Sequence, residues 1–435
     1  MSRYKTYQDY MDSELPWLQE VPEHWQLSRL GKWFEERNDT VSDKDYQPLS
    51  VTMQGIVPQL ETAAKSDAGD NRKKVLKGDF VINSRSDRKG SSGISTHDGS
   101  VSLISIVLKP QGISPKYTHY LLRSQPFQEE FYRYGKGIVA DLWSTKFNDM
   151  KNIILAVPSS IEQHTIANFL DHETAKIDDL IAKQERLIEL LKEKRQAVIS
   201  HAVTKGLNPD APMKDSGVEW LGEVPEHWSV SKIGYLCKVG NGSTPNRDNS
   251  DFWEDGYIPW LNSSKVNDNF IHSADQFVTL SALTKCHLPM VKKDSLVVGI
   301  TGQGKTRGMS ALLKFDATVN QHLAYIQVVS PSVKPEFLHL YIKAQYARIR
   351  YESSGWGSTK DAITCNDIKK YFVPIPPLDE QNNIIKNTHQ KLTIIDSLVS
   401  KSEATRSLLT ERRTALISAA VTGKIDVRNW KTDTH

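Results

Sequence analysis

The chain carries one frame twice, and this internal duplication constrains its fold more than any other feature. Residues 12–31 and 215–234 are identical at twelve of twenty positions, at a constant offset of 203. Further matches follow at an offset of 218: Glu162-Gln163 with Glu380-Gln381, Asn148-Asp149 with Asn366-Asp367, and residues 197–204 with 415–422. Each half therefore opens and closes with the same segments, which is typical of a duplicated scaffold.

The segments between these matches differ. Residues 35–140 and 238–358 share almost no identity, and the change of offset from 203 to 218 gives the second segment 15 more residues. Two copies of a scaffold that hold two different inserts suggest one task performed on two ligands. Alternatively, the two inserts bind two different half-sites of a single ligand.

Length and composition describe an ordinary globular protein. With 435 residues, 38% of them hydrophobic, and a mean hydropathy of -0.47, the chain is long enough for two or three domains. No window approaches about 18 consecutive apolar residues, so we expect no membrane insertion, and the N-terminus shows no secretion signal. Only three cysteines occur, in no CxxC pair, so we expect no disulfide framework or zinc site, and a cytoplasmic location.

The closing segments predict two long helices. Residues 160–204 contain neither Pro nor Gly, and apolar residues recur at helical spacing, which indicates a helix of roughly 60 Å with a narrow coiled-coil seam. Ser160 and Gln163 predict a capping box at its start, and Gly206 and Gly423 predict C-terminal caps. The two helices most simply pair with each other, although a partner chain is an alternative. The seam residues taken as candidates for partner binding are Ile177, Leu180, Leu187, Leu191, Ile395, Leu398, Leu409 and Leu416.

The inserts predict mixed α/β domains. Short apolar runs at 79–83, 101–108, 295–300 and 322–329 indicate strands, and each insert then has an amphipathic helix. These helices fall at residues 115–132, where we expect Pro126 to break the first, and at residues 335–351. The expected fold is mixed α/β, with two globular domains that alternate with two long helices paired as an antiparallel coiled coil, in an internal pseudo-twofold duplication. The expected boundaries are 1–158 and 207–377 for the domains, 159–206 and 378–425 for the helices, and 426–435 for a C-terminal tail.

One stretch formally matches a phosphate-binding loop. Residues 299–306, GITGQGKT, fit the GxxxxGK[ST] pattern and follow a predicted strand. A true P-loop continues into a helix, whereas here Gly308 and an apolar run indicate another strand. We therefore predict a basic hairpin loop and not an ATPase site.

No other pattern indicates catalysis. His24 and His227 occur in the duplicated EVPEHW, where Pro and Trp neighbours favour a packing element over a catalytic base. The sequence shows no methyltransferase motif and no nuclease cluster of carboxylates and lysine. We therefore expect no catalytic residue, no metal site and no enzyme activity in this chain alone.

Positive charge gathers on the inserts. Residues 65–89 hold eight Lys or Arg against four Asp, and residues 285–314 hold six against one, whereas the first long helix is nearly neutral. Such loops combine cations that neutralise phosphates with groups that pair with base edges. The candidate DNA-binding residues are Arg85, Arg88, Lys89, Arg133, Lys136, Arg247, Asn262, Ser263, Lys265, Gln303, Lys305, Arg307, Trp356, Thr359 and Lys360.

The order of parts resembles the specificity subunit of type I restriction-modification enzymes over essentially the whole chain. The strings that carry the resemblance are the two PEHW segments, the two Asn-Asp pairs, the Pro-x-x-x-Glu-Gln before each long helix, and the endings RQAVISHAVTKG and RTALISAAVTGK. The loop that contains Gly302 and Lys305 is also similar to one in that family's recognition domains. The first half lacks this loop, so we expect the two inserts to read bases with different residues.

The resemblance implies a non-catalytic subunit that reads a split sequence in double-stranded DNA. It implies two adenine methyltransferase subunits as partners on the helices, motor-nuclease subunits for cleavage, and no membrane. S-adenosylmethionine, ATP and Mg²⁺ would act in those partners, and this chain would hold no cofactor. The alternatives are a protein-interaction adaptor built on the coiled coil and, third, a P-loop NTPase.

Overall fold

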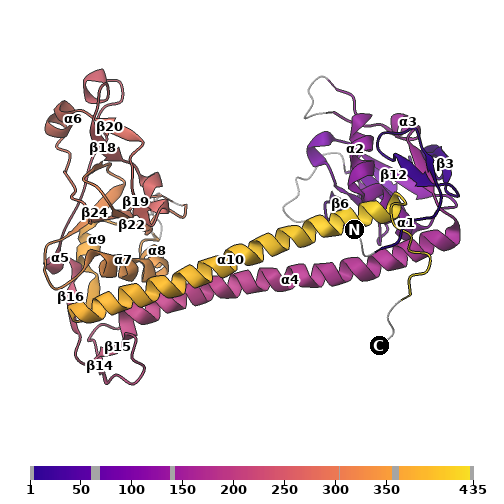
Figure 1. Cartoon of the computed structure of the whole chain (residues 1–435). Helices are drawn as coiled ribbons and strands as arrows, with labels where there is room; N and C mark the ends of the chain where they lie inside the picture. The colour runs from indigo at the N-terminus through magenta and orange to yellow at the C-terminus, as the bar shows by residue number, and fades with distance from the viewer. Residues whose placement is uncertain (1–3, 60–68, 138–142, 303, 355–361, 432–435) are drawn as a thin grey trace. The chain divides into compact units, whose positions relative to one another are not determined.

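The computed structural model describes residues 4–59, 69–137, 143–302, 304–354 and 362–431 (Figure 1). It divides into two compact units. Unit 1 comprises residues 1–185 and 403–435, and unit 2 comprises residues 186–402. Both boundaries fall inside the long helices, so each unit contains one globular insert together with part of each helix.

Unit 1 is built on an antiparallel sheet with the strand order β10-β9-β12-β4. Its strands are β4 (Phe34–Glu36), β9 (Phe80–Asn83), β10 (Ser92–Ile94) and β12 (Ser105–Pro110). A second sheet has the order β11-β8-β5. Its strands are β5 (Thr40–Val41), β8 (Arg72–Val75) and β11 (Gly99–Val101), beside the hairpin of β6 (Leu49–Thr52) and β7 (Gly55–Pro58). The single strand expected at 101–108 is therefore two strands in different sheets.

The helices of this insert follow β12. They are α1 (Pro115–Arg123), α2 (Gln125–Arg133) and α3 (Phe147–Met150). The break between α1 and α2 falls at Ser124, whose hydroxyl caps α2 by accepting a hydrogen bond from the Phe127 amide. Pro126 occupies the first turn of α2, which confirms that the proline ends the preceding helix.

Unit 2 repeats this topology although its insert shares almost no sequence with the first. Its main sheet has the order β17-β24-β21-β22-β19, and the first four strands pair as β4, β12, β9 and β10 do in unit 1. The strands are β17 (Cys237–Asn241), β19 (Phe270–Ile271), β21 (Leu296–Gly299), β22 (Ser310–Leu313) and β24 (Leu323–Val328). The smaller sheet is β20-β18-β23, with strands β18 (Ile258–Leu261), β20 (Gln276–Val278) and β23 (Thr318–Val319).

The helices of unit 2 are α5 (Ile233–Leu236), α6 (Leu280–Lys285), α7 (Pro335–Ala344), α8 (Tyr346–Glu352) and α9 (Cys365–Lys370). Three of these, α7, α8 and α9, follow the main sheet in the same order as α1, α2 and α3 of unit 1. The expected single helix at 335–351 is wrong, because the chain leaves the helix at Gln345 without a proline to mark the break.

The duplicated opening segments form equivalent strand pairs. The pairs are β1 (Tyr10–Asp12) with β2 (Glu20–Pro22), β3 (Gln26–Arg29) with β13 (Ile154–Val157), β14 (Met213–Asp215) with β15 (Glu223–Pro225), and β16 (Ser229–Lys232) with β25 (Phe372–Ile375). The β3–β13 and β16–β25 pairs join the two ends of each insert, so each insert leaves its frame and returns to it at one place.

The Glu of each duplicated Glu-Gln pair anchors the opening segment. Glu162 is buried, and its carboxylate accepts hydrogen bonds from Tyr7 Oη at 2.6 Å and Trp25 Nε1 at 3.1 Å. His24 Nε2 lies 3.0 Å from the same carboxylate. In unit 2, His227 Nε2 and Trp228 Nε1 lie 2.8 and 3.0 Å from Glu380. The structure thus confirms that EVPEHW is a packing element.

The Gln of each pair ties a long helix to its insert. The Gln163 side chain donates to Pro158 O at 2.9 Å and accepts from the Ser114 amide at 2.8 Å, just before α1. Gln381 donates to Pro376 O and accepts from the Lys334 amide, both at 2.8 Å, just before α7. The predicted capping box of Ser160 with Gln163 is wrong, since Gln163 has this role and Ser159 caps the helix.

Replacing Glu162 with Ala is expected to destabilise the protein by about 3 kcal/mol, because Trp25 Nε1 and Tyr7 Oη would stay buried without an acceptor. Urea unfolding of the full chain measures this. Glu380→Ala is the matched control and is expected to cost about 1 kcal/mol, because, of the described groups, only Trp228 Nε1 would lose its acceptor inside the protein, whereas His227 is half exposed and can turn to water. Equal losses would contradict this account.

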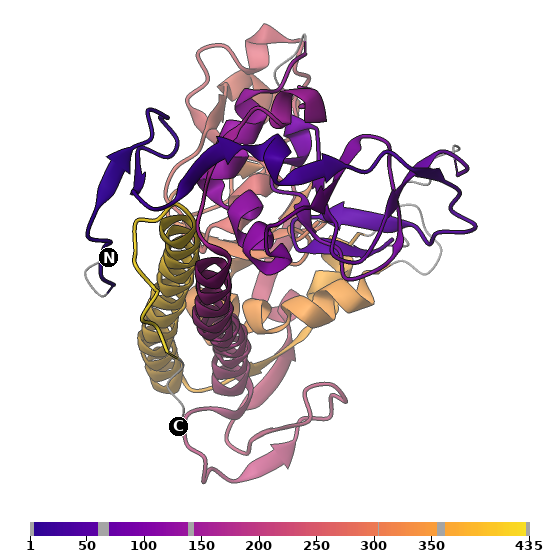
Figure 2. The ribbon, with the colours of Figure 1, turned by 90° about the vertical axis from the view of Figure 1, so that its right-hand side faces the viewer.

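The long helices are α4 (Ser160–Lys205) and α10 (Leu378–Val421), and they pair antiparallel within each unit. In unit 1, Arg413 of α10 forms two hydrogen bonds with Asp178 of α4, the shorter at 2.7 Å. In unit 2, Arg195 of α4 donates to Asp396 of α10 at 2.8 Å. Figure 2 shows the C-terminal part of α10 beside the N-terminal part of α4. Gly206 and Gly423 have φ of +79° and +75°, which confirms the predicted C-terminal caps.

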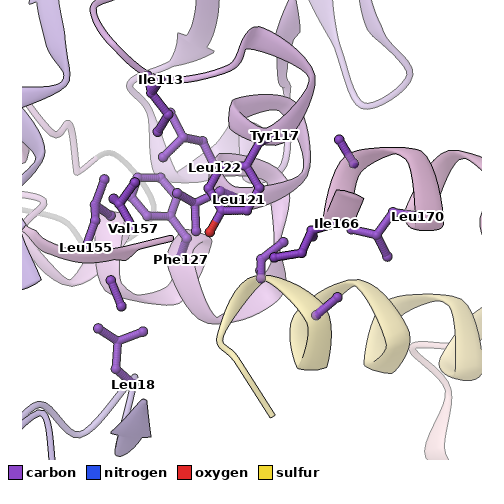
Figure 3. Close-up of a cluster of buried hydrophobic side chains, with 14 of the residues drawn as sticks. Leu18, Ile113, Tyr117, Leu121, Leu122, Phe127, Leu155, Val157, Ile166 and Leu170 are labelled. Atoms are coloured by element: carbon purple, nitrogen blue, oxygen red, sulfur yellow. The ribbon is translucent and has the colours of Figure 1, made fainter. Parts of the chain in front are cut away.

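Each unit has one main core that includes parts of both long helices. In unit 1, side chains from α1, α2, β13 and α4 converge on one another (Figure 3). Leu416 and Ala420 of α10 belong to the same core. In unit 2, Ile199 of α4 and Ile384 of α10 pack with the strands and with α7. The insert and the helices are therefore a single hydrophobic unit in each half, and neither helix is a separately folded spacer.

Candidate nucleic-acid interface

Two equivalent hairpin loops carry the expected cations. In unit 2, β21 and β22 pair antiparallel, so the described residues between them form a hairpin loop, and the element that follows Lys305 is strand β22 and not a helix. The prediction of a basic hairpin loop, instead of a P-loop, is therefore confirmed. In unit 1, β9 and β10 form the equivalent hairpin, and its loop spans residues 84–91. We call these the recognition loops.

The structure brings several candidates of unit 1 together. Arg85 and Lys136 both form backbone bridges with Ser144, so the recognition loop lies beside the segment that follows α2. Arg88 is 69% exposed, and Lys89 is also exposed on the same loop. Arg85 and Lys136 pair with Asp87 and Asp149, whereas Arg133 is held by Glu130 on its own helix. An exposed cluster of cations therefore occupies this edge of the insert.

Apart from Arg247, the described candidates of unit 2 lie on two structural elements. Lys305 is exposed on the recognition loop. Lys265 is only 16% exposed and pairs with Asp275 at 2.7 Å, in the short 3-10 helix Ser263–Asn267. Asn262 caps that helix by accepting from the Ser264 amide, and Ser263 is its first residue. Val266 and Asn267 of this helix line a cavity with Lys305, so the two elements are neighbours.

Arg247 is held against aromatic rings. Its guanidinium lies 3.8 Å from the ring centre of Trp253 and 4.9 Å from that of Trp260, and it donates to Gln276 Oε1 at 2.8 Å. This stacking fixes an exposed Arg in one orientation at low entropic cost, which suits recognition of a phosphate or a base edge.

The structure contradicts the expectation that Arg307 contacts DNA. Only 2% of Arg307 is exposed, and its guanidinium donates to the backbone oxygens of Ser353 and Arg350. Burial and the charge of Arg350 lower its pKa. Arg307 therefore supports the loop from beneath and presents no cation to solvent.

Sequence reasoning also missed the residues that hold this loop from α8. Tyr346 Oη donates to Lys305 O at 2.7 Å, and Arg350 Nη1 donates to Gly304 O at 2.5 Å. No sequence signal marks them, because they lie about forty positions from the loop. The candidates Gln303, Trp356, Thr359 and Lys360 lie outside the described residues.

The predicted seam residues of the long helices divide into two sets. Ile177, Leu191, Ile395 and Leu416 are buried within their own units, so they cannot contact a partner in this conformation. Leu409 is partly buried in the core of unit 1. Leu180, Leu187 and Leu398 are 46%, 42% and 44% exposed. Ile394 and Leu408 are more exposed still, at 62% and 65%, and the seam pattern missed them.

Within the described ranges, no group of three or more His, Cys, Asp or Glu side chains is placed to hold a metal ion. No helix in the described part of the chain combines the length and apolar character needed to span a membrane.

Comparison with known proteins shows which proteins this chain resembles. A family model for the type I restriction modification DNA specificity domain matches residues 225–401. A putative MjaX specificity subunit from Methanocaldococcus jannaschii is 22% identical, over 94% of this chain and 95% of that protein. The EcoBI specificity subunit of Escherichia coli is 24% identical, over 65% of this chain and 60% of the relative. The sequence is thus similar to those of DNA specificity subunits.

Solved structures agree on the fold. The HsdS subunit from Thermoanaerobacter tengcongensis superposes with a TM-score of 0.56 and 17% identity, over 93% of this chain and 98% of that one. A chain from a structure of assembly and conformational transition in the type I R-M system gives a TM-score of 0.70 at 15% identity, over 92% and 98%. The chain therefore shares the fold of these structures, and its sequence is similar to that of type I restriction-modification specificity subunits.

Proposed function

We propose that this chain reads a bipartite DNA sequence, one part with each insert, and recruits the subunits that methylate and cleave DNA. One observation carries the proposal: two inserts of equal topology and dissimilar sequence present equivalent recognition loops with exposed cations. Equal topology gives both inserts the same way of approaching a groove. Dissimilar loops give them different bases to recognise.

The exposed candidates divide by their chemistry. Arg88, Lys89, Lys136 and Lys305 are cations suited to phosphates, where they fix position without reading sequence. Arg247, whose guanidinium is fixed by two Trp rings, is suited to a bidentate contact with guanine. Base readout in unit 1 rests on Arg85 and the polar side chains beside it.

The exposed apolar residues of α4 and α10 suit partner subunits. Leu180, Leu187 and Leu398, with the more exposed Ile394 and Leu408, place apolar surface on helices whose other faces are charged. We assign these residues to adenine methyltransferase subunits, two of them because the frame is duplicated. S-adenosylmethionine, ATP and Mg²⁺ act in the partner subunits of this proposal, in the cytoplasm, and this chain holds none of them.

The test is a footprint of the full chain on duplex DNA, with any subunits that co-purify. The expected result is protection in two separate patches, together with methylation of adenines in the same target. An adaptor that binds only proteins would give no protection at any salt concentration. Protection of one continuous patch would contradict the proposal that the DNA target has two separate parts.

Replacing Lys305 with Ala is expected to weaken binding to cognate and unrelated duplexes alike. If Lys305 neutralises one phosphate, the slope of log affinity against log salt becomes shallower by about 0.9. Binding titrations at several salt concentrations measure this. Lys265→Ala is the control, and we expect a smaller change because Lys265 is mostly buried against Asp275. A change in sequence preference without a change in slope would show a base contact instead.

A further inference from the structure

The first helices of the two inserts share a pattern that neither duplicated segment includes. At an offset of 220, α1 and α7 align Pro115 with Pro335, His119 with His339, Arg123 with Lys343, and Gln125 with Gln345. Each helix begins with Pro, and the His and the cation lie one turn apart on one face. A His followed four residues later by a cation therefore recurs within otherwise unrelated inserts.

The long helices add a second repeated pair beside this face. Arg413 pairs with Asp178 in unit 1, and Arg195 pairs with Asp396 in unit 2, at the common offset of 218. In unit 1, Arg413 lines a cavity of about 520 Å³ together with His119 and Arg123. In unit 2, Arg195, His339 and Lys343 line a cavity of about 160 Å³. The same set of groups thus surrounds a hollow in both units.

Each recognition loop contributes a cation to this hollow or to one that adjoins it. Lys89 lines the cavity of unit 1. Lys305 lines a second cavity of unit 2, of about 290 Å³, which shares Asn269 and Lys343 with the smaller one. We define the cationic cavity of unit 1 by Arg123, Arg413 and Lys89. The cationic cavity of unit 2 consists of the two adjoining hollows that Lys343 lines, and we define it by Lys343, Arg195 and Lys305.

The central cation of each cavity lacks a carboxylate partner among the described residues. Arg123 lies 2.9 Å from His119 Nε2 and donates to Met53 O at 2.5 Å, and Lys343 donates to Asn269 Oδ1 at 2.5 Å. Arg413 and Arg195 are neutralised by Asp178 and Asp396. Each cavity thus keeps two positive charges without a counterion, one of them only partly exposed.

Electrostatics agree with a missing anion. Burial and then the charge of Arg195 lower the pKa of Lys343 to about 8. Burial and the charge of Arg123 lower the pKa of His119 to about 4, and burial lowers the pKa of His339 to about 3. Both imidazoles are therefore neutral near pH 7 and offer no counter-charge. A desolvated cation without an anion nearby costs free energy, yet each unit retains such a cation.

We propose that each cationic cavity binds one phosphate of the DNA backbone and so fixes the position of the duplex on its insert. This proposal rests on the proposed function. A ligand common to both halves suits a site that is the same in both, whereas the bases read by the two inserts differ. The recognition loops favour DNA over an acidic partner protein as the ligand, because the loop proposed to approach the duplex also places Lys89 or Lys305 in the lining of the cavity.

The test uses Arg123→Gln and Lys343→Gln, singly and together, in the full chain with its co-purifying subunits. Each single variant is expected to lose about tenfold in affinity for cognate and unrelated duplexes equally, with a salt slope shallower by about 0.9. The preference for the cognate sequence stays unchanged. Arg123→Lys and Lys343→Arg are expected to restore most of the affinity, and thermal melting verifies that all variants fold.

Lys183→Gln is the matched control, since Lys183 is an exposed cation of α4 paired only with Asp179. Wild-type affinity and slope in both Gln variants would overturn the inference, and so would a loss confined to cognate DNA. Loss of the methyltransferase subunits with DNA binding intact would assign the cavities to an acidic protein surface and also overturn it. If the unaltered protein gives no two-patch footprint, it is the proposed function that fails.

Discussion

Exchanging residues 35–150 for the corresponding segment of a relative is expected to change one half of the recognised DNA sequence and to leave the other half intact. This segment contains the recognition loop of unit 1 and the helices that support it, including α1 to α3. The pairing of β3 with β13 lies outside the exchange and closes the frame around it. The new insert is therefore joined to the frame through the same strand pair as the original insert.

A methylation map of a genome that carries the exchanged chain measures the result. Unit 2 provides the reciprocal control, because replacing residues 238–358 is expected to change only the other half of the target. An altered map in both halves, or in neither, would refute the division of labour between the inserts. The cationic cavity predicts a further constraint: relatives that keep a cation at the position of Arg123 are the better donors.

Lengthening both long helices by one heptad is expected to widen the unread gap of the target by about three base pairs. Seven helical residues add about 10.5 Å, and each base pair of duplex occupies about 3.4 Å. The insertion points are the unit boundaries, after Glu185 in α4 and after Ser402 in α10. A heptad keeps each flanking residue on its original face, so pairs such as Arg413 with Asp178 stay intact.

The adenines methylated by the lengthened protein report the new gap. Seven residues inserted in α4 alone are the control, and they are expected to lower stability and abolish binding, because the helices then fall out of register. An unchanged gap in the doubly lengthened protein would show that the helices do not set the distance between the half-sites.

The sequence predicted the frame well, because the frame is repeated within the chain. Both EVPEHW and Glu-Gln occur twice, and in each half the structure shows a hydrogen bond between them, from Trp25 to Glu162 and from Trp228 to Glu380. The shared topology of the inserts could not be predicted. It rests on strand pairings, such as β9 with β12 and β21 with β24, that do not require the same side chains.

The candidate site was predicted less completely. Arg307 looked like an exposed loop cation, but α8 covers it, and no local pattern reveals a contact with Ser353. The signal for the cationic cavities was present in the repeated His and cation of α1 and α7. This repeat was missed because its offset of 220 differs from the offsets of 203 and 218 that relate the frame segments. In addition, Arg413 and Arg195, which face it, lie on the long helices and not on the inserts.

The division of the helices between the units has a consequence for synthesis on the ribosome. Unit 2 is one continuous stretch of chain, whereas the core of unit 1 needs Leu416 and Ala420, which are made near the end. At typical rates of about 5 to 20 residues per second, the first 185 residues wait on the order of 10 to 50 s for the segment that completes them. The half of the protein that is translated first is therefore the half that matures last.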